Sequence, residues 1–263
     1  MRVDGCSALI TGASAGLGRD FARQLGGRAG MLVLVARRVD RLEELKAELA
    51  GRHTNLQVHV RATDLSKADE TEALCSWLEN QQLAIDLLIN NAGLGDRGTF
   101  VTSKPERVMD MLAVNVTALT LLTRRLLPAM VARGAGAILN VSSSASFLPM
   151  REFAVYAATK AYVTSFSEAL RMELRGSGVS VTALCPGPVH TEFDEVAFRA
   201  GEPPPTSAPE FTYVDSNEVV RAALNGVESD NAIVVPGAVM KIGMSLVRLA
   251  PIPLLRFVSR FAK

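Results

Sequence analysis

Residues 7–18 read SALITGASAGLG, a short aliphatic run followed at once by glycines at positions 12, 16 and 18. Residues 19–25 continue with a helical pattern, so this stretch predicts a β-strand, a glycine turn and an α-helix. Such a turn needs glycine where φ is positive and where the backbone approaches a pyrophosphate, which the amides at the helix N-terminus then bind. The spacing departs from G-x-G-x-x-G, so a tight connection without a ligand is the alternative. The position directly after the first strand favours a nucleotide cofactor.

The rest of the chain alternates short aliphatic runs with helical patterns, which is typical of βαβ units that build a parallel sheet. The expected strands are residues 7–10, 31–36, 56–60, 87–90, 137–142, 179–184 and 233–235. Several are unbroken apolar runs, as expected for strands that helices cover on both faces. The sequence therefore predicts an α/β fold, a single doubly wound Rossmann-type domain over residues 1–263 with a seven-stranded parallel sheet flanked by helices.

Helical periodicity is clearest in residues 41–50, where Leu42, Leu45 and Leu49 recur on one face. Residues 108–130 form a long, mostly apolar helical stretch, which we expect to be buried on all sides. Residues 201–209 contain three consecutive prolines, which exclude a regular helix, so a loop is predicted there.

The composition narrows the class of protein. The formal net charge is +1, which gives no electrostatic reason to expect a nucleic-acid partner. The three cysteines are widely separated, and the histidines show no metal-ligand spacing, so neither a disulfide framework nor a metal site is expected. No charged segment followed by a cleavable apolar stretch opens the chain. We expect a cytoplasmic protein that acts on a small molecule.

The end of the second expected strand predicts which cofactor binds. An acidic residue there would hydrogen-bond the ribose hydroxyl of NAD, whereas this chain has Arg37 and Arg38. A guanidinium matches a 2′-phosphate in charge and in geometry, and Ser14 in the glycine turn could add a hydroxyl. This position predicts NADP(H), the alternative being that the two arginines are solvated charges at a strand end.

Residues 137–162 read AILNVSSSASFLPMREFAVYAATKAY, in which Tyr156 and Lys160 fall on one face of an expected helix. A free phenol has a pKa of about 10, and a neighbouring ammonium lowers it by favouring the phenolate. The pair could therefore exchange a proton near neutral pH. An ordinary exposed helix pair is the alternative reading.

With these motifs in order, the chain resembles the short-chain dehydrogenase/reductase family over nearly its whole length. The matching positions are Thr11 to Gly18, Asp64, Asn90 to Gly93, Asn115, Ser143, Tyr156, Lys160 and Pro186-Gly187. Ser143 precedes Tyr156 by thirteen residues, the separation usual in that family, which selects it over Ser142 and Ser144.

The resemblance implies a role for each matching residue. Tyr156 would be the general acid in reduction, Ser143 would hold the substrate carbonyl oxygen, and Lys160 would bind the nicotinamide ribose and lower the tyrosine pKa. Asn115 would position a proton-relay water, while Asn90 would be structural. The cofactor-binding residues implied are Gly12, Ser14, Gly16, Leu17, Gly18, Arg37, Arg38, Asp64, Leu65, Asn91, Ala92, Gly93, Tyr156, Lys160, Pro186, Gly187, Val189 and Thr191.

These residues predict an NADP(H)-dependent oxidoreductase that reduces a ketone or aldehyde, or oxidises the corresponding alcohol. A non-catalytic NADP-binding sensor or scaffold is the alternative from another class, and the complete catalytic set argues against it. Residues 188–215 are the expected substrate-binding loop. Its side chains Phe193, Val196, Phe198 and Phe211 favour an apolar ketone if they line the site, or simply pack against the domain. A ketoacyl or sterol-type substrate and a small carbonyl both remain open.

Residues 231–263 are expected to hold the last strand and a basic amphipathic tail. The tail carries Lys241, Arg248, Arg256, Arg260 and Lys263 and no acidic residue, and charges interrupt its apolar runs before they could span a bilayer. Peripheral contact with a membrane, a shield over the substrate, a subunit interface and a helix docked on the core all stay open. By resemblance, helices near residues 104–133 and 153–175 pair across a two-fold axis, so a homodimer or homotetramer is expected.

Overall fold

The computed structural model describes residues 1–199 and 209–249 and contains one seven-stranded parallel sheet, in the order β3-β2-β1-β4-β5-β6-β7. The strands are β1 (Ser7–Thr11), β2 (Met31–Ala36), β3 (Gln57–Ala62), β4 (Leu87–Asn90), β5 (Gly136–Val141), β6 (Val179–Leu184) and β7 (Ile233–Val234). All seven predicted strands are present. The largest difference is β3, which starts one residue later and ends two residues later than expected.

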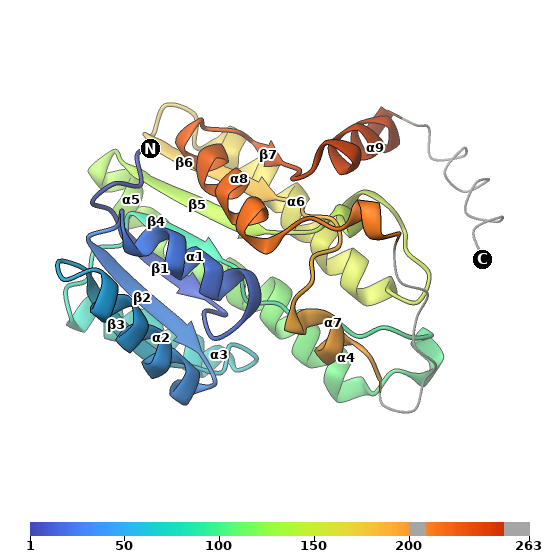
Figure 1. Ribbon diagram of the computed structural model, residues 1–263, viewed down its shortest axis with the longest axis horizontal. Helices are drawn as coiled ribbons and strands as arrows, with labels where there is room; N and C mark the ends of the chain where they lie inside the picture. Colours follow the sequence, from blue (N-terminus) through green and yellow to red (C-terminus); the bar gives the residue numbers. More distant parts are fainter. Residues whose placement is uncertain (200–208, 250–263) are drawn as a thin grey trace.

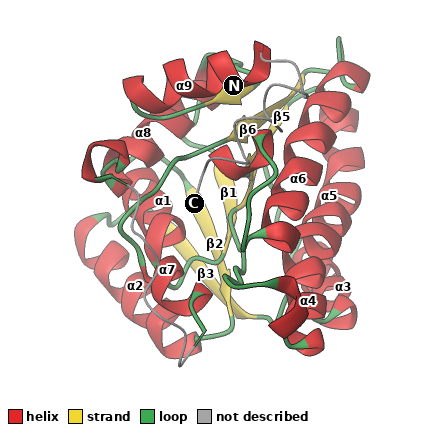
Figure 2. Ribbon diagram, turned by 90° about the vertical axis from the view of Figure 1, so that its right-hand side faces the viewer, coloured by secondary structure: helices red, strands yellow, loops and turns green. Residues whose placement is uncertain are grey.

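Helices cover both faces of the sheet (Figures 1 and 2). They are α1 (Gly16–Gly26), α2 (Val39–Arg52), α3 (Ala68–Asn80), α4 (Pro105–Leu112), α5 (Leu119–Arg133), α6 (Ala154–Glu173), α7 (Glu192–Ala197), α8 (Ser216–Glu228) and α9 (Ala238–Leu249). Short 3-10 turns lie at η1 (Phe100–Thr102), η3 (Ser144–Phe147) and η4 (Glu210–Thr212), and a π-helical segment, η2 (Ala113–Ala118), joins α4 to α5. Figure 2 shows α1, α2 and α8 on one side of the sheet and α3 to α6 on the other.

Each face of the sheet has its own hydrophobic core. Phe21 of α1 and Leu45 of α2 pack on one face with Val219 of α8, while Leu74 of α3 and Leu122 of α5 pack on the other. Because both faces are covered, a central strand such as β2 is apolar and buried along its whole length, whereas β3 at the edge of the sheet carries polar residues. The strand order reverses between β1 and β4, and in open α/β sheets ligands bind at such a switch point, beyond the carboxyl ends of the strands.

One prediction about the helices was wrong. Residues 108–130 are not buried on all sides: Met109 is 63% exposed, and Arg124 and Arg125 are exposed as well. The stretch is also not one α-helix, because the π-helical turn of η2 interrupts it. A π-turn shifts which side chains share a face, so the apolar residues of α4 and α5 do not form one buried stripe.

The three cysteines are free and buried, at positions 6, 75 and 185. Burial raises the pKa of Cys6 to about 12, and burial also raises the pKa of Cys75. The predicted loop at residues 201–209 lies outside the described residues except for Pro209, and so does the tail from residue 250 onward. Among the described residues, no helix is both long and apolar enough to cross a membrane.

Candidate active site

The glycine turn brings the start of α1 against the ends of β1 and β4. Gly12 has φ +67°, and a Cβ built on it would lie 2.9 Å from the Ala92 Cα. A Cβ on Gly18 would lie 2.2 Å from the Gly12 carbonyl oxygen and 2.6 Å from the Asn91 Nδ2. Both distances are too short for any side chain, so only glycine allows this close packing. The turn therefore leaves backbone amides at a helix N-terminus, where a pyrophosphate binds.

Hydrogen bonds join the two strand ends at the switch point. The Thr11 hydroxyl accepts from the backbone amides of Asn91 (2.9 Å) and Ala92 (3.0 Å). The Asn91 side-chain amide donates to the Thr11 carbonyl oxygen at 2.9 Å. The predicted cofactor residues Asn91 and Ala92 thus lie against the glycine turn, with their conformation determined by Thr11, whose role the sequence reasoning did not predict.

The end of β2 carries the residues predicted to bind a 2′-phosphate. Arg38 points to Ser14, whose Oγ accepts from two guanidinium nitrogens at 3.3 and 3.4 Å. Arg38 also pairs with Glu192 at 3.1 Å, and Arg41 pairs with the same carboxylate at 2.7 Å. The sequence reasoning missed Arg41 and Glu192, although Arg41 follows Arg38 by about one helical turn.

Arg37 lies toward Asp64 instead. The pKa of Asp64 is lowered, since hydrogen bonds from the Ser66 amide and hydroxyl, together with the charge of Arg37, outweigh the effect of burial. Leu65 beside it is buried. Asp64 and Leu65 follow β3, next to the end of β2, which is where the resemblance places the adenine.

The catalytic candidates Tyr156 and Lys160 both lie on α6. Lys160 is 4% exposed, and its Nζ donates to the Val141 carbonyl oxygen at 2.8 Å and lies 5.7 Å from the centroid of the Tyr156 ring. Burial lowers the pKa of Lys160 to about 8. A lysine with that pKa is still mostly charged at neutral pH, beside the tyrosine that it is predicted to influence.

The three consecutive serines differ in their contacts. Ser142 is buried, and its hydroxyl donates to the Lys160 carbonyl oxygen at 2.8 Å and lies 2.7 Å from the Thr164 hydroxyl. Ser143 is half-buried and accepts from the Ala145 amide at 3.1 Å, which leaves its own hydrogen available to a ligand. The contacts therefore agree with the selection of Ser143 over Ser142.

Asn115 lies in the π-helical segment η2 and connects three parts of the site. Its Oδ1 accepts from the Leu94 amide at 2.8 Å, and its Nδ2 donates to the Leu94 carbonyl oxygen and to the Thr159 hydroxyl. A Cβ on Gly93 would lie 3.4 Å from the Lys160 Nζ and 3.6 Å from the Asn115 Oδ1. The segment after β4 therefore lies directly against α6, which carries Tyr156 and Lys160.

Asn90 belongs to the interior of the sheet rather than to this surface. It is buried, and its Nδ2 donates to the Asn140 Oδ1 at 2.9 Å and to the Thr123 hydroxyl at 3.2 Å. These contacts agree with the structural role that the sequence predicted.

The residues predicted at the nicotinamide end follow β6. The Ser144 amide donates to the Pro186 carbonyl oxygen at 2.8 Å, which joins this segment to the serine loop. A Cβ on Gly187 would lie 2.9 Å from the Met240 Cγ, and a Cβ on Gly16 would lie 3.4 Å from the Thr191 Cβ. The segment thus runs between the serine loop and the glycine turn, while Val189 packs on the core.

Helix α7 of the expected substrate loop packs against Tyr156. The ring centroids of Phe193 and Tyr156 are 5.4 Å apart, and a Cβ on Gly95 would lie 2.7 Å from the Phe193 ring. Of the four apolar side chains expected to line the site, Phe193 is in ring contact with Tyr156. Phe211 is 71% exposed, and Val196 and Phe198 are exposed too.

The last residue of α7 is attached to the segment after β4, because the Ala197 carbonyl oxygen accepts from the Arg97 amide at 2.9 Å. Two residues further on, Arg199 donates to both oxygens of the buried Asp96 carboxylate, at 2.8 and 2.7 Å. Hydrogen bonding to Arg199 lowers the pKa of Asp96. Arg107 of α4 adds hydrogen bonds to the carbonyl oxygens of Gly95 and Val196, and Figure 1 shows α4 and α7 beside each other.

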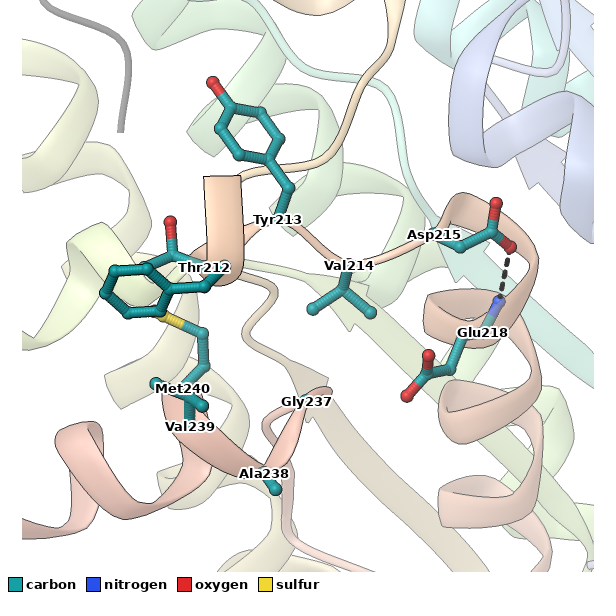
Figure 3. Close-up of a pocket in the computed structure, with 10 residues that line it drawn as sticks. Thr212, Tyr213, Val214, Asp215, Glu218, Gly237, Ala238, Val239 and Met240 are labelled. Carbon is teal, nitrogen blue, oxygen red and sulfur yellow. Dashed lines mark hydrogen bonds between the residues drawn. The ribbon is translucent and has the colours of Figure 1, made fainter. Parts of the chain in front are cut away.

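A separate cavity of about 160 Å³ lies where η4 meets the starts of α8 and α9 (Figure 3). It is lined by Phe211, Thr212, Tyr213, Val214, Asp215, Glu218, Gly237, Ala238, Val239 and Met240. None of the predicted catalytic side chains lines it, and Asp215 is occupied in capping α8. In the described parts of the chain, no group of three acidic, histidine or cysteine residues could hold a metal ion.

The residues at the carboxyl ends of the strands fit NADP(H). The glycine turn has no room for side chains. Lys160 and Ser143 lie at one end of this site, and Ser14 lies at the other end with Arg38 and, beside it, Arg41. An arginine pair with a hydroxyl matches the 2′-phosphate that distinguishes NADP from NAD.

Comparisons with known proteins agree with this geometry. The family model described as short chain dehydrogenase matches residues 7–200. A sulfoacetaldehyde reductase of Chromohalobacter salexigens is 40% identical over 194 residues, which is 70% of this chain and 72% of that protein.

Two solved structures are similar over most of their length. A short-chain dehydrogenase from Sphingobium yanoikuyae in complex with NADPH has a TM-score of 0.79 and 33% identity, and the match covers 89% of this chain and 88% of that one. A bulky-bulky ketone specific alcohol dehydrogenase from Comamonas testosteroni has a TM-score of 0.78 and 30% identity, with coverage of 93% and 92%. The chain therefore belongs to the short-chain dehydrogenase/reductase family and is an NADP(H)-dependent oxidoreductase with the doubly wound fold of that family.

Proposed function

We propose that this enzyme reduces an apolar ketone or aldehyde, with Tyr156 as the proton donor. The observation that carries the proposal is the position of the Tyr156 ring, which lies against Phe193 on one side and near the buried ammonium of Lys160. The centroid of a second aromatic ring, Phe153, lies 5.5 Å from that of Tyr156, so two phenylalanine rings pack around the tyrosine ring. Such surroundings suit a carbonyl with hydrocarbon substituents.

Each catalytic side chain has a defined task in this reaction. When bound, NADPH supplies the hydride that reaches the carbonyl carbon. Ser143 donates a hydrogen bond to the carbonyl oxygen, which stabilises the negative charge that develops there. Tyr156 then gives its proton to that oxygen, and the alcohol forms.

Lys160 and Asn115 support this transfer. The ammonium favours the phenolate left on Tyr156, because an opposite charge nearby lowers the pKa of a phenol. Asn115 holds the segment after β4 against α6 through its contacts with Leu94 and Thr159. The proton-relay water that the resemblance assigns to Asn115 belongs to the same proposal.

The relatives include enzymes named for both of the substrate classes that the sequence left open. The Comamonas testosteroni enzyme is named for bulky ketones, and the Chromohalobacter salexigens enzyme for a small aldehyde. The aromatic surroundings of Tyr156 favour the larger, apolar class. A panel of ketones and aldehydes of increasing size, followed by NADPH absorbance, separates the two classes.

We also propose that the chain assembles through α4 to α6 as a homodimer or homotetramer in the cytoplasm. Apolar side chains on these helices are exposed, which is typical of an interface. They are Met109, Leu112, Val131, Tyr162 and Met172.

The apolar residues Val239, Ile242 and Leu246 of α9 are exposed as well. Peripheral membrane contact through the tail therefore stays a prediction, which vesicle co-sedimentation tests.

The experiment that tests the catalytic proposal is Tyr156→Phe. Loss of the phenol proton should lower kcat by about 10²- to 10⁴-fold, the usual contribution of a general acid. NADPH binding, followed by cofactor fluorescence, should stay within about twofold, since ring packing is retained. Tyr162→Phe is the matched control, because that tyrosine lies on the same helix with its hydroxyl 2.9 Å from the Thr120 hydroxyl. A Tyr156→Phe enzyme with a normal kcat would exclude Tyr156 as the acid.

A further inference from the structure

A compact group of charges joins the cofactor end of the site to the substrate loop. We call Ser14, Arg38, Arg41 and Glu192 the arginine–glutamate cluster. Glu192 accepts one hydrogen bond from Arg38 at 3.1 Å and two from one nitrogen of Arg41 at 2.7 and 2.9 Å. Arg38 also donates to Ser14. One carboxylate thus lies between Arg38, which is predicted to bind the 2′-phosphate, and Arg41, which lies beside it.

Glu192 brings a negative charge to the arginines that a 2′-phosphate would also contact. Hydrogen bonds from Arg41 and Arg38 outweigh partial burial and lower the pKa of Glu192, so the carboxylate is ionised at neutral pH. A 2′-phosphate brings up to two further negative charges to the same arginines. Two anions cannot share these donors without like-charge repulsion, so Glu192 and the phosphate compete for them.

We propose that Glu192 is an internal competitor for the 2′-phosphate of NADP(H) and leaves the two arginines when that phosphate binds. NADH has no 2′-phosphate, so it leaves Glu192 in place. The carboxylate thereby lowers the affinity for NADP(H) without affecting the affinity for NADH, and it is a determinant of cofactor specificity.

The competition also reaches the substrate loop. Glu192 is the first residue of α7, and the next residue, Phe193, packs against Tyr156. The far end of α7 has its own attachment, because Ala197 accepts from the Arg97 amide and Arg199, just beyond the helix, binds Asp96. Binding of the phosphate therefore frees the first turn of α7 while its last turn stays attached. The 2′-phosphate is in this way coupled to the helix that covers the catalytic tyrosine.

The experiment compares Glu192→Gln with the wild-type enzyme by calorimetry, using 2′,5′-ADP and 5′-AMP as probes. The two probes differ only in the 2′-phosphate, and neither can transfer a hydride, so the result does not depend on the catalytic role of Tyr156. Glu210→Gln is the matched control: it removes another carboxylate that flanks the same loop and pairs with His190. All three proteins are used as the full chain.

Glu192→Gln should bind 2′,5′-ADP about three- to tenfold more tightly, a modest gain because the pairs that are lost are partly exposed. The affinity for 5′-AMP should change by less than about twofold, and Glu210→Gln should match the wild type for both probes. Weaker or unchanged binding of 2′,5′-ADP by Glu192→Gln would overturn the proposal, since Glu192 would then orient the arginines rather than compete with the phosphate.

Hydrogen exchange tests the coupling to α7. In the wild type, 2′,5′-ADP should speed amide exchange in the peptide that spans residues 191–197, whereas 5′-AMP should not. In Glu192→Gln the same peptide should exchange fast without any ligand, and the effect of 2′,5′-ADP should disappear. Equal exchange in the two proteins, with or without the probe, would overturn the coupling.

Discussion

The predicted cofactor site has two ends, one at Lys160 and one at Arg38 and Arg41, and the positive charges at these ends lie in opposite environments. At the catalytic end a single ammonium, that of Lys160, is 4% exposed and has a pKa lowered to about 8 by burial. At the phosphate end the side chains of Arg38 and Arg41 are 43% and 36% exposed, and both are paired with one carboxylate. The first charge acts in a low-dielectric interior, and the second pair acts at the surface.

This difference indicates at which end of the site the enzyme can tolerate amino-acid substitutions. A charge in the interior interacts strongly with its neighbours, so a single substitution there alters reactivity or stability by several kcal/mol. Exposed ion pairs contribute little each and are screened by salt, so the phosphate end can be adjusted in small steps. Cofactor preference is therefore easier to change than catalysis.

The largest expected effect is on kcat, and it is expected at Ser143, which lies at the same end of the site as Lys160. Ser143→Ala removes a hydrogen-bond donor aimed at the developing oxyanion, and kcat should fall by about 10²- to 10³-fold with NADPH affinity nearly unchanged. Steady-state kinetics and a fluorescence titration measure the two quantities. Ser144→Ala is the control, because the contact of Ser144 with Pro186 uses its backbone amide. Equal kcat values for the two variants would place the oxyanion contact elsewhere.

A smaller effect, on stability, should follow from the pKa of Lys160. Its folded pKa of about 8 lies below the ordinary 10.5, so between these pH values the unfolded chain binds the extra proton. The wild type should therefore gain about 3 kcal/mol in free energy of unfolding as pH rises from 8 to 10.5, relative to Lys160→Met. Below pH 8 the difference between the two should be constant.

Urea denaturation at a series of pH values measures this difference. Lys46→Met, which removes an exposed lysine, should run parallel to the wild type throughout. A Lys160→Met curve that also stays parallel would mean that burial does not perturb Lys160.

The smallest effect is expected at the phosphate end. Arg38→Ala should weaken NADPH binding by about tenfold, since it removes one charge-assisted contact, and it should change NADH binding by less than about twofold. The loss should shrink as salt is added. Arg37→Ala should lose less NADPH affinity, because Arg37 lies toward Asp64. An equal loss of NADH affinity in Arg38→Ala would show that the residue supports the fold rather than the phosphate.

Much of the fold could be predicted because its signals are local. Several strands, such as β2, are unbroken apolar runs, and Leu42, Leu45 and Leu49 repeat with the helical period. The glycines at 12 and 18 allow a backbone contact that no other residue permits. The order of the motifs then identified the family, and with it the catalytic candidates. Each of these signals can be recognised in the sequence without knowledge of long-range contacts.

The parts that the sequence did not reveal depend on contacts between distant residues. Arg41 and Glu192 are 151 positions apart, and two charged residues on exposed surfaces carry no periodic signal that they will meet. An apolar run likewise predicts burial only if something covers it, which is why α4 and α5 differ from the expectation. The contact of Phe193 with Tyr156 needs the path of the loop, which composition alone does not determine.

The burial of Cys6, Cys75 and Cys185 has a practical consequence for studies of this enzyme in solution. A thiol reacts with maleimides as its thiolate, and all three thiols are buried, with the pKa of Cys6 and of Cys75 raised by burial. We therefore expect the three native cysteines to react little with a maleimide, so that a single introduced cysteine can be labelled selectively. A fluorophore attached to Val196→Cys, on the exposed side of α7, would report movement of that helix as cofactor is added.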